Sequence, residues 1–105
     1  MQIQQLVDQF KQAVLSIYGE DLSKVILFGS YARGDFQEDS DVDFLVVLNK
    51  KQINPFKEIL KMNEKIYDLT LDSGKLISFL PTTLNRYESF QTPFYVNIRK
   101  DGRIV

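Results

Sequence analysis

The chain contains no cysteine and no histidine among its 105 residues. Without cysteine there is no disulfide framework, no thiol nucleophile and no thiolate metal site. Without histidine there is no imidazole base, no Ser-His-Asp triad and no ordinary zinc site. The chemistry that remains is that of carboxylates, hydroxyls, lysine, arginine and an oxygen-preferring cation such as Mg²⁺.

Long apolar runs and an excess of charge of one sign are also missing. No apolar stretch approaches the ~20 residues that a transmembrane helix needs, and the first ten residues lack the pattern of a signal peptide. The formal net charge of −1 gives no overall attraction to nucleic acid or to an anionic membrane. We therefore expect a cytoplasmic protein that binds no membrane and does not bind nucleic acid directly.

The composition is that of one globular domain. Hydrophobic residues make up 44% of the chain and charged residues 26%, which is ordinary for a soluble protein. There is no repeat and no linker that would divide the chain. A single domain over 1–105 is predicted, large enough for its own core.

The first half of the chain alternates helical and strand patterns. Apolar residues recur at three- and four-residue intervals over 3–17, which predicts an amphipathic helix. The apolar run 25–28 is typical of a buried strand, and 31–40 predicts a turn or short helix followed by a loop. A second strand is predicted over 41–48, with side chains alternating between two faces.

In the second half, Asn54 followed by Pro55 predicts the start of a helix, with asparagine as its cap. Apolar residues continue this helix at helical spacing: Phe56, Ile59, Leu60, Ile66 and Tyr67. A turn over 72–74 precedes a predicted strand over 75–80, and 82–91 and 92–102 predict two further helices. The order indicates an α/β (α+β) fold, a small mixed sheet flanked by helices.

Two carboxylates open the second predicted strand. Asp41 and Asp43 are two residues apart, so on a strand they point to the same face. Like charges a few ångströms apart repel each other, and a charge beside an apolar strand is unfavourable unless it is paired or bound to a metal. A divalent cation relieves both effects, and Mg²⁺ prefers one or two carboxylates with phosphate oxygens and water.

Gly29 and Ser30 end the preceding strand, so their turn can stand beside these carboxylates. Glycine permits close backbone approach to a phosphate, and serine adds a hydroxyl donor. Each feature by itself is most simply a turn at a strand end. Together, with ten residues between Ser30 and Asp41 and apolar strands on both sides, they favour a nucleotide site.

This pattern resembles the nucleotidyltransferase superfamily of DNA polymerase β, whose signature is Gly-Ser, a ten-residue gap, and then Asp-x-Asp or Asp-x-Glu. Residues 29–34 (Gly-Ser-Tyr-Ala-Arg-Gly) and 40–43 (Ser-Asp-Val-Asp) resemble the minimal nucleotidyltransferases, the MNT proteins, more narrowly. The similarity covers the whole chain in length and element order. It implies a nucleotidyltransferase fold like the polymerase β palm.

The resemblance implies that Asp41 and Asp43 hold two Mg²⁺ ions and that ATP is the nucleotide donor. Gly29 and Ser30 would contact the β- and γ-phosphates, and Arg33 would either neutralise phosphate charge or remain solvated. Many MNT proteins pair with a HEPN-domain RNase toxin and act as its antitoxin by adding AMP to a tyrosine. The resemblance therefore implies a HEPN partner.

One departure from the family pattern leaves two hypotheses open. Active members usually carry a third carboxylate on the strand beside the Asp-x-Asp strand, and 75–80 contains none. Asp68 and Asp72 lie upstream, in a predicted helix end or turn. The chain is then either a Mg²⁺-dependent nucleotidyltransferase or a weak or inactive relative that neutralises its partner by binding.

Overall fold

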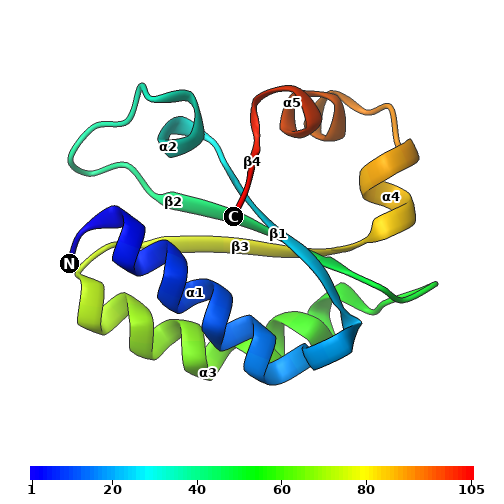
Figure 1. Ribbon diagram of the computed structural model, residues 1–105, viewed down its shortest axis with the longest axis horizontal. Helices are drawn as coiled ribbons and strands as arrows, with labels where there is room; N and C mark the ends of the chain where they lie inside the picture. The colour runs from blue at the N-terminus through cyan, green and yellow to red at the C-terminus, as the bar shows by residue number, and fades with distance from the viewer.

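The computed structural model describes residues 1–105, and a four-stranded sheet lies at its centre (Figure 1). The elements in chain order are α1 (Ile3–Tyr18), a 3₁₀ turn (Gly19–Asp21), β1 (Leu22–Phe28), α2 (Ser30–Arg33), β2 (Val42–Leu48), α3 (Pro55–Ser73), β3 (Ile77–Thr83), α4 (Leu84–Ser89), α5 (Pro93–Asp101) and β4 (Arg103–Ile104). No helix combines the length and the apolar character needed to cross a membrane.

The strands lie in the order β3-β2-β1-β4, and their directions are mixed. β1 runs antiparallel to both β2 and β4, whereas β2 and β3 are parallel. In the β1–β2 pair, Phe28 lies opposite Asp43, so the end of β1 meets the start of β2. The prediction of a mixed α/β sheet flanked by helices is confirmed.

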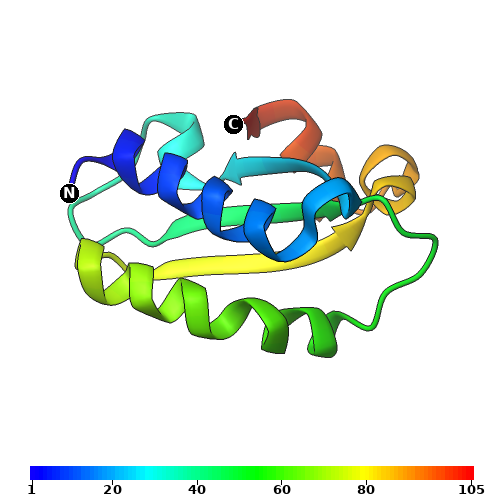
Figure 2. The same cartoon turned by 60° about the horizontal axis from the view of Figure 1, so that its bottom comes forward.

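α1 and α3 lie side by side and cover one face of the sheet (Figure 2). Phe10 of α1 stacks on Phe44 of β2, with ring centroids 3.9 Å apart and planes 7° from parallel. Because side chains alternate along a strand, the neighbours of Phe44 face the other way, and Leu45 and Val47 join Ile26 and Ile98 of α5 in a second core. The sheet therefore separates two apolar layers.

Helix α3 begins as predicted. The Asn54 side chain accepts hydrogen bonds from the backbone N–H groups of Phe56 and Lys57, at 3.1 and 3.3 Å, and Pro55 occupies the first turn. The apolar residues expected along this helix do not share one face, however. Ile66 is buried, whereas Phe56, Leu60 and Tyr67 are exposed; the buried positions are Glu58, Met62, Ile66 and Leu69.

The buried Glu58 has several partners near the start of α3. Its carboxylate accepts a hydrogen bond of 2.9 Å from the Tyr18 hydroxyl at the end of α1. Lys61 and Lys50 lie 3.5 and 4.0 Å from it. Burial, the hydrogen bond to Glu58 and the Glu58 charge all raise the pKa of Tyr18, which therefore stays a neutral donor. These contacts join α1, α3 and the segment that follows β2.

Several element boundaries differ from those predicted. β3 starts two residues later than 75 and extends through Pro81 to Thr83, and proline is tolerated there because β3 is an edge strand. α4 is consequently shorter than 82–91, and the Thr83 side chain caps it by accepting from Arg86 N–H. The two-residue strand β4 is too short to show an alternating apolar pattern in the sequence. It is a strand only because it pairs with β1.

The stacked pair of Phe10 and Phe44 is expected to contribute strongly to the stability of the fold. Phe10→Ala removes a fully buried ring and leaves a cavity, so the free energy of unfolding should fall by about 3–5 kcal/mol. Urea denaturation followed by circular dichroism measures this change. Gln12→Ala, on an exposed position of α1, is the control and should change stability little. A loss below about 1 kcal/mol for Phe10→Ala would contradict the packing described.

Candidate functional site

The antiparallel pairing of β1 and β2 assembles the predicted site. Gly29 follows the last residue of β1, and Phe28 is the partner of Asp43, so the Gly29–Ser30 turn lies beside the carboxylates. Asp41 immediately precedes β2 rather than lying within it. The structure thus brings together the two segments that sequence analysis singled out.

Gly29 stands directly against the Asp43 carboxylate. Its backbone has φ +74° and ψ −155°, a conformation that residues with a side chain rarely adopt. A Cβ atom at this position would overlap Asp43 Oδ2. Glycine is therefore required at position 29 for two reasons. Its backbone angles are unfavourable for other residues, and the Asp43 carboxylate occupies the space that a side chain would need.

The Asp43 carboxylate is in an unfavourable electrostatic environment. Partial burial raises its pKa above the ordinary value, and the negative charge of Asp41 raises it further. The positive charge of Arg33 acts in the opposite direction. Two carboxylates of like negative charge, one of them partly desolvated, form a place where a cation would be stabilised.

The short helix α2 positions Arg33 near this pair. Backbone N–H groups of Ala32 and Arg33 both donate to the Gly29 carbonyl at 3.1 Å, which starts the helix at the turn. Arg33 is exposed, and its Nε lies 3.2 Å from Asp35 Oδ2. Tyr31 is buried and stacks on Phe36, with centroids 4.4 Å apart. Tyr31 is therefore a packing residue.

A hollow of about 230 Å³ opens beside the Gly29 turn. One wall comes from the end of β1 and from α2, and the other from α5. Its lining consists of Phe28, Gly29, Arg33, Phe94, Asn97, Ile98 and Asp101. Sequence analysis missed the α5 residues, because their spacing is that of an ordinary surface helix and only the tertiary fold brings them to Gly29.

The parallel pairing of β2 with β3 shows which residue stands where a third carboxylate would be sought. Ser78 is the register partner of Asp43, and paired residues on neighbouring strands share a face of the sheet. Ser78 is exposed. The structure contains no group of three or more Asp, Glu, His or Cys residues that could hold a metal ion.

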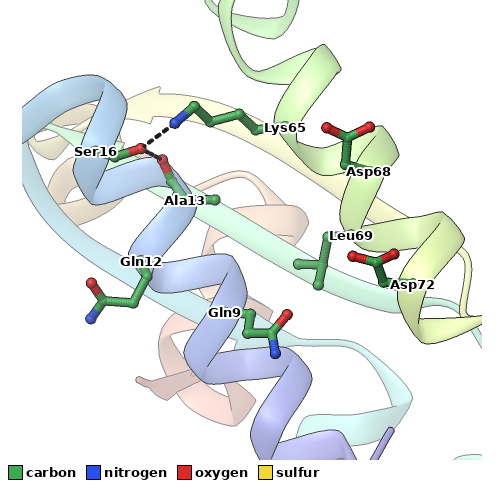
Figure 3. Close-up of a pocket in the computed structure, with 8 residues that line it drawn as sticks. All are labelled: Gln9, Gln12, Ala13, Ser16, Lys65, Asp68, Leu69 and Asp72. Atoms are coloured by element: carbon green, nitrogen blue, oxygen red, sulfur yellow. Dashed lines mark hydrogen bonds between the residues drawn. The ribbon is translucent and has the colours of Figure 1, made fainter.

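Asp68 and Asp72 do not supply the missing carboxylate. Both lie on α3, beside a groove of about 390 Å³ between α1 and α3 (Figure 3). Lys65 Nζ donates to Ser16 Oγ across this groove at 2.8 Å. Because α1 and α3 cover the sheet face opposite to that of Asp43, these two aspartates are separated from the pair by the sheet.

The residues beside the Gly29 turn fit a divalent cation. Asp41 and Asp43 offer carboxylate oxygens, the donors that Mg²⁺ prefers, and their repulsion is the kind that a cation relieves. Because Gly29 has no side chain, the Asp43 carboxylate can occupy the space that a Cβ atom would fill beside the turn. The structure thus places side by side the two parts of the Gly-Ser and Asp-x-Asp signature that resembles the nucleotidyltransferases.

Comparison with known proteins agrees with this class. A family model described as a nucleotidyltransferase domain matches residues 7–105. A Methanocaldococcus jannaschii relative named "Putative protein adenylyltransferase" is 44% identical over 62 residues, which are 59% of this chain and 61% of the relative. A second relative of that name and organism is 30% identical across 100% of this chain and 99% of its own length. The chain therefore belongs to the nucleotidyltransferase domain family.

Solved structures share the fold. A crystal structure described as a "putative nucleotidyltransferase" from Sulfolobus solfataricus has a TM-score of 0.64 and 22% identity, covering 97% of this chain and 83% of the other. A structure described as a toxin-antitoxin with AMP-PNP also has a TM-score of 0.64, with 17% identity, covering 98% of this chain and 72% of the other. The predicted family and fold are confirmed.

The contact between Gly29 and Asp43 yields a test with a built-in control. Gly29→Ala should destabilise the fold through both backbone strain and overlap with the carboxylate, whereas Gly34→Ala has φ +83° but open space around the new Cβ. Strain alone costs about 1–3 kcal/mol, so Gly29→Ala should lower the free energy of unfolding by more than Gly34→Ala does. Urea denaturation of both variants measures the difference. Equal losses would show that Asp43 does not press against residue 29.

Proposed function

We propose that this chain transfers AMP from ATP to a hydroxyl group of a partner protein, a tyrosine of a HEPN-domain toxin, and thereby acts as its antitoxin. The observation that carries the proposal is the contact of the Gly29 turn with Asp43, with Asp41 near enough to raise the Asp43 pKa. Full-length similarity to a relative named for protein adenylyl transfer supports the same reaction.

In this reaction the acceptor oxygen attacks the α-phosphorus of ATP, a new P–O bond forms, and the bond to the β-phosphate breaks, releasing pyrophosphate. The acceptor proton leaves to water. Asp41 and Asp43 would hold Mg²⁺, which supplies charge stabilisation to the triphosphate and lowers the pKa of the acceptor hydroxyl. The turn at Gly29 and Ser30 orients the phosphates, and Arg33 offsets their negative charge.

The nucleoside fits the hollow between Gly29 and α5. This hollow adjoins the turn that would take the phosphates, and Phe28 and Phe94 give it aromatic edges. The ring centroids of these two residues lie 5.8 Å apart in an edge-to-face arrangement. An aromatic wall beside a polar residue, Asn97, suits a nucleobase, which combines a flat apolar surface with a hydrogen-bonding edge.

The acceptor is placed on another protein because the domain has little surface to spare for a separate acceptor-binding lobe. The similarity in fold between this chain and the structure described as a toxin-antitoxin with AMP-PNP supports a toxin as the partner. A HEPN toxin and a tyrosine acceptor are the form of this pairing that the MNT resemblance implies.

A second function is favoured by one observation, the serine at position 78. With Ser78 in register with Asp43 and no third carboxylate near it, the site has fewer ligands than an active family member. In this alternative the chain retains the fold and restrains its partner by contact alone. Transfer of radiolabelled AMP from ATP to the purified toxin partner distinguishes the two functions directly.

The carboxylate pair is tested by Asp41→Asn and Asp43→Asn. Each change keeps the side-chain shape and removes a charge, so the apo fold should survive while Mg²⁺-ATP no longer stabilises it. Loss of a metal ligand should lower AMP transfer by roughly a thousandfold, several kcal/mol of transition-state stabilisation. Thermal melting with and without Mg²⁺-ATP, together with the AMP-transfer assay, measures both effects.

Asp72→Asn is the matched control for this experiment. It makes the same chemical change on α3, across the sheet from the pair, and should leave both measurements as in the wild type. If Asp41→Asn and Asp43→Asn both keep the full Mg²⁺-ATP shift and normal transfer, the site lies elsewhere.

Position 78 offers a gain-of-function test. Ser78→Asp places a carboxylate in register with Asp43, so it should raise Mg²⁺ affinity by roughly tenfold, because affinity follows the number of charged ligands. Isothermal titration with Mg²⁺ in the presence of a non-hydrolysable ATP analogue measures the change. Ser78→Asn has the same shape without the charge and should not raise affinity. If the two variants behave alike, position 78 does not face the metal site.

A further inference from the structure

The outward face of α3 carries an apolar stripe that nothing in the chain covers. The stripe consists of Phe56, Leu60, Tyr67 and Leu71, whose exposed fractions lie between 58% and 69%. α3 forms the outer edge of the helical layer, so this side of it is open to solvent (Figure 2). An amphipathic helix usually buries its single apolar face against the core of its own domain. Because α3 has a second apolar face, that face can be buried only against another molecule.

The two faces of α3 lie nearly opposite each other. Successive residues of a helix are rotated by about 100°, so positions 56, 60, 67 and 71 fall within about 60° of one another. The buried residues Met62, Ile66 and Leu69 project from the other side of the helix. The stripe is therefore not an extension of the core, and large exposed apolar patches of this kind mark interaction surfaces.

The spacing of the stripe is symmetric about its centre. Phe56 and Leu60 are four residues apart, as are Tyr67 and Leu71, and the midpoint falls between Asn63 and Glu64. Two such helices laid antiparallel place Phe56 opposite Leu71 of the other copy, and Leu60 opposite Tyr67. A two-fold interface requires this self-complementary arrangement, which a surface made for an unrelated protein does not need.

We propose that two copies of this chain associate through their α3 helices, packed antiparallel along the stripe of Phe56, Leu60, Tyr67 and Leu71. The proposal is independent of the nucleotidyl-transfer function. The Gly29–Asp43 site lies on the other side of the sheet and remains open in such a dimer.

Two of the charges beside the stripe, Lys57 and Asp68, complement the same pairing. Lys57 and Asp68 lie on one flank of the stripe, and neither has an ion-pair partner in its own chain. They are eleven residues apart, about 16 Å along the helix, too far to pair with each other. In the antiparallel arrangement, Lys57 of each copy comes beside Asp68 of the other, which gives two symmetric ion pairs. A parallel arrangement would place like charges together.

The area of the stripe determines how strongly two copies are expected to associate. Four large apolar side chains per copy, each more than half exposed, give an interface of about 1,000 Å² in total. This is the lower limit for a specific interface, so a reversible dimer is expected, one that forms at micromolar concentration. The dimer should have twice the 12.2 kDa mass of the chain.

Analytical ultracentrifugation over a concentration series tests the association. The wild type should shift from monomer to dimer, and Leu60→Asp should stay monomeric, because it places a charge at the centre of the interface. Ile104→Asp is the matched control: it puts the same charge in place of an equally exposed apolar residue on β4, at the opposite edge of the sheet from β3, against which α3 packs. This control should dimerise like the wild type.

The ion pairs provide a second test that does not depend on apolar contacts. Lys57→Asp and Asp68→Lys should each weaken the dimer at least fivefold, since each sets like charges against each other. The double variant should recover the wild-type dissociation constant, and an equimolar mixture of the two single variants should form a mixed dimer. Rescue in the double variant and in the mixture is specific to a contact between Lys57 and Asp68 of different copies.

The absence of cysteine makes the orientation measurable. A single Glu64→Cys lies near the two-fold axis and should cross-link to its own copy with a short bis-maleimide. Leu71→Cys should not, because antiparallel packing separates the two positions by about 22 Å. A monomer at every concentration, an unaffected Leu60→Asp dimer, or cross-linking through Leu71→Cys would each overturn the proposal. The proposal would also be overturned if the amide groups of α3 became protected from hydrogen exchange only on addition of a toxin partner, because the stripe would then bind the toxin and not a second copy.

Discussion

The arrangement of the site depends on one constraint, the antiparallel register that sets Phe28 of β1 opposite Asp43 of β2. This register brings the turn after β1 against the Asp43 carboxylate at the start of β2. The two are so close that a Cβ atom at position 29 would overlap the carboxylate, so only glycine fits there. Gly29 in turn starts α2, because its carbonyl accepts the first helical hydrogen bonds. The place of Arg33, and one wall of the hollow beside it, follow from the same pairing.

Much of this arrangement could be predicted, because the residues that form it are close in sequence. The alternation of Val42, Phe44, Val46 and Leu48 with the residues between them identifies β2 and its two faces. Asn54 and Pro55 mark the start of α3 by local chemistry alone. Gly29, Ser30, Asp41 and Asp43 form a pattern of fixed spacing, and both strands that carry it are short and apolar.

Features that depend on distant pairing could not be predicted in the same way. Nothing local indicates that Ser78 stands beside Asp43, because a parallel register is set by the whole β2–α3–β3 crossover. Helical spacing alone could not separate the buried from the exposed apolar residues of α3, since Ile66 and Tyr67 both fit a helical pattern. The buried Glu58 would have been assigned to solvent, and only its contacts with Tyr18, Lys50 and Lys61 explain it.

The hollow beside Gly29 has walls of different origin. Residues of β1 and α2 form one side, close in sequence to the carboxylates, whereas α5 forms the other and comes from near the end of the chain. Substitutions in α5 can alter the shape of the hollow while the β1–β2 register, and with it the carboxylate pair, stays unchanged. Under the proposed function, the carboxylates that would perform the chemistry and the helix that would select the nucleoside come from separate parts of the chain, so the two can diverge independently during evolution.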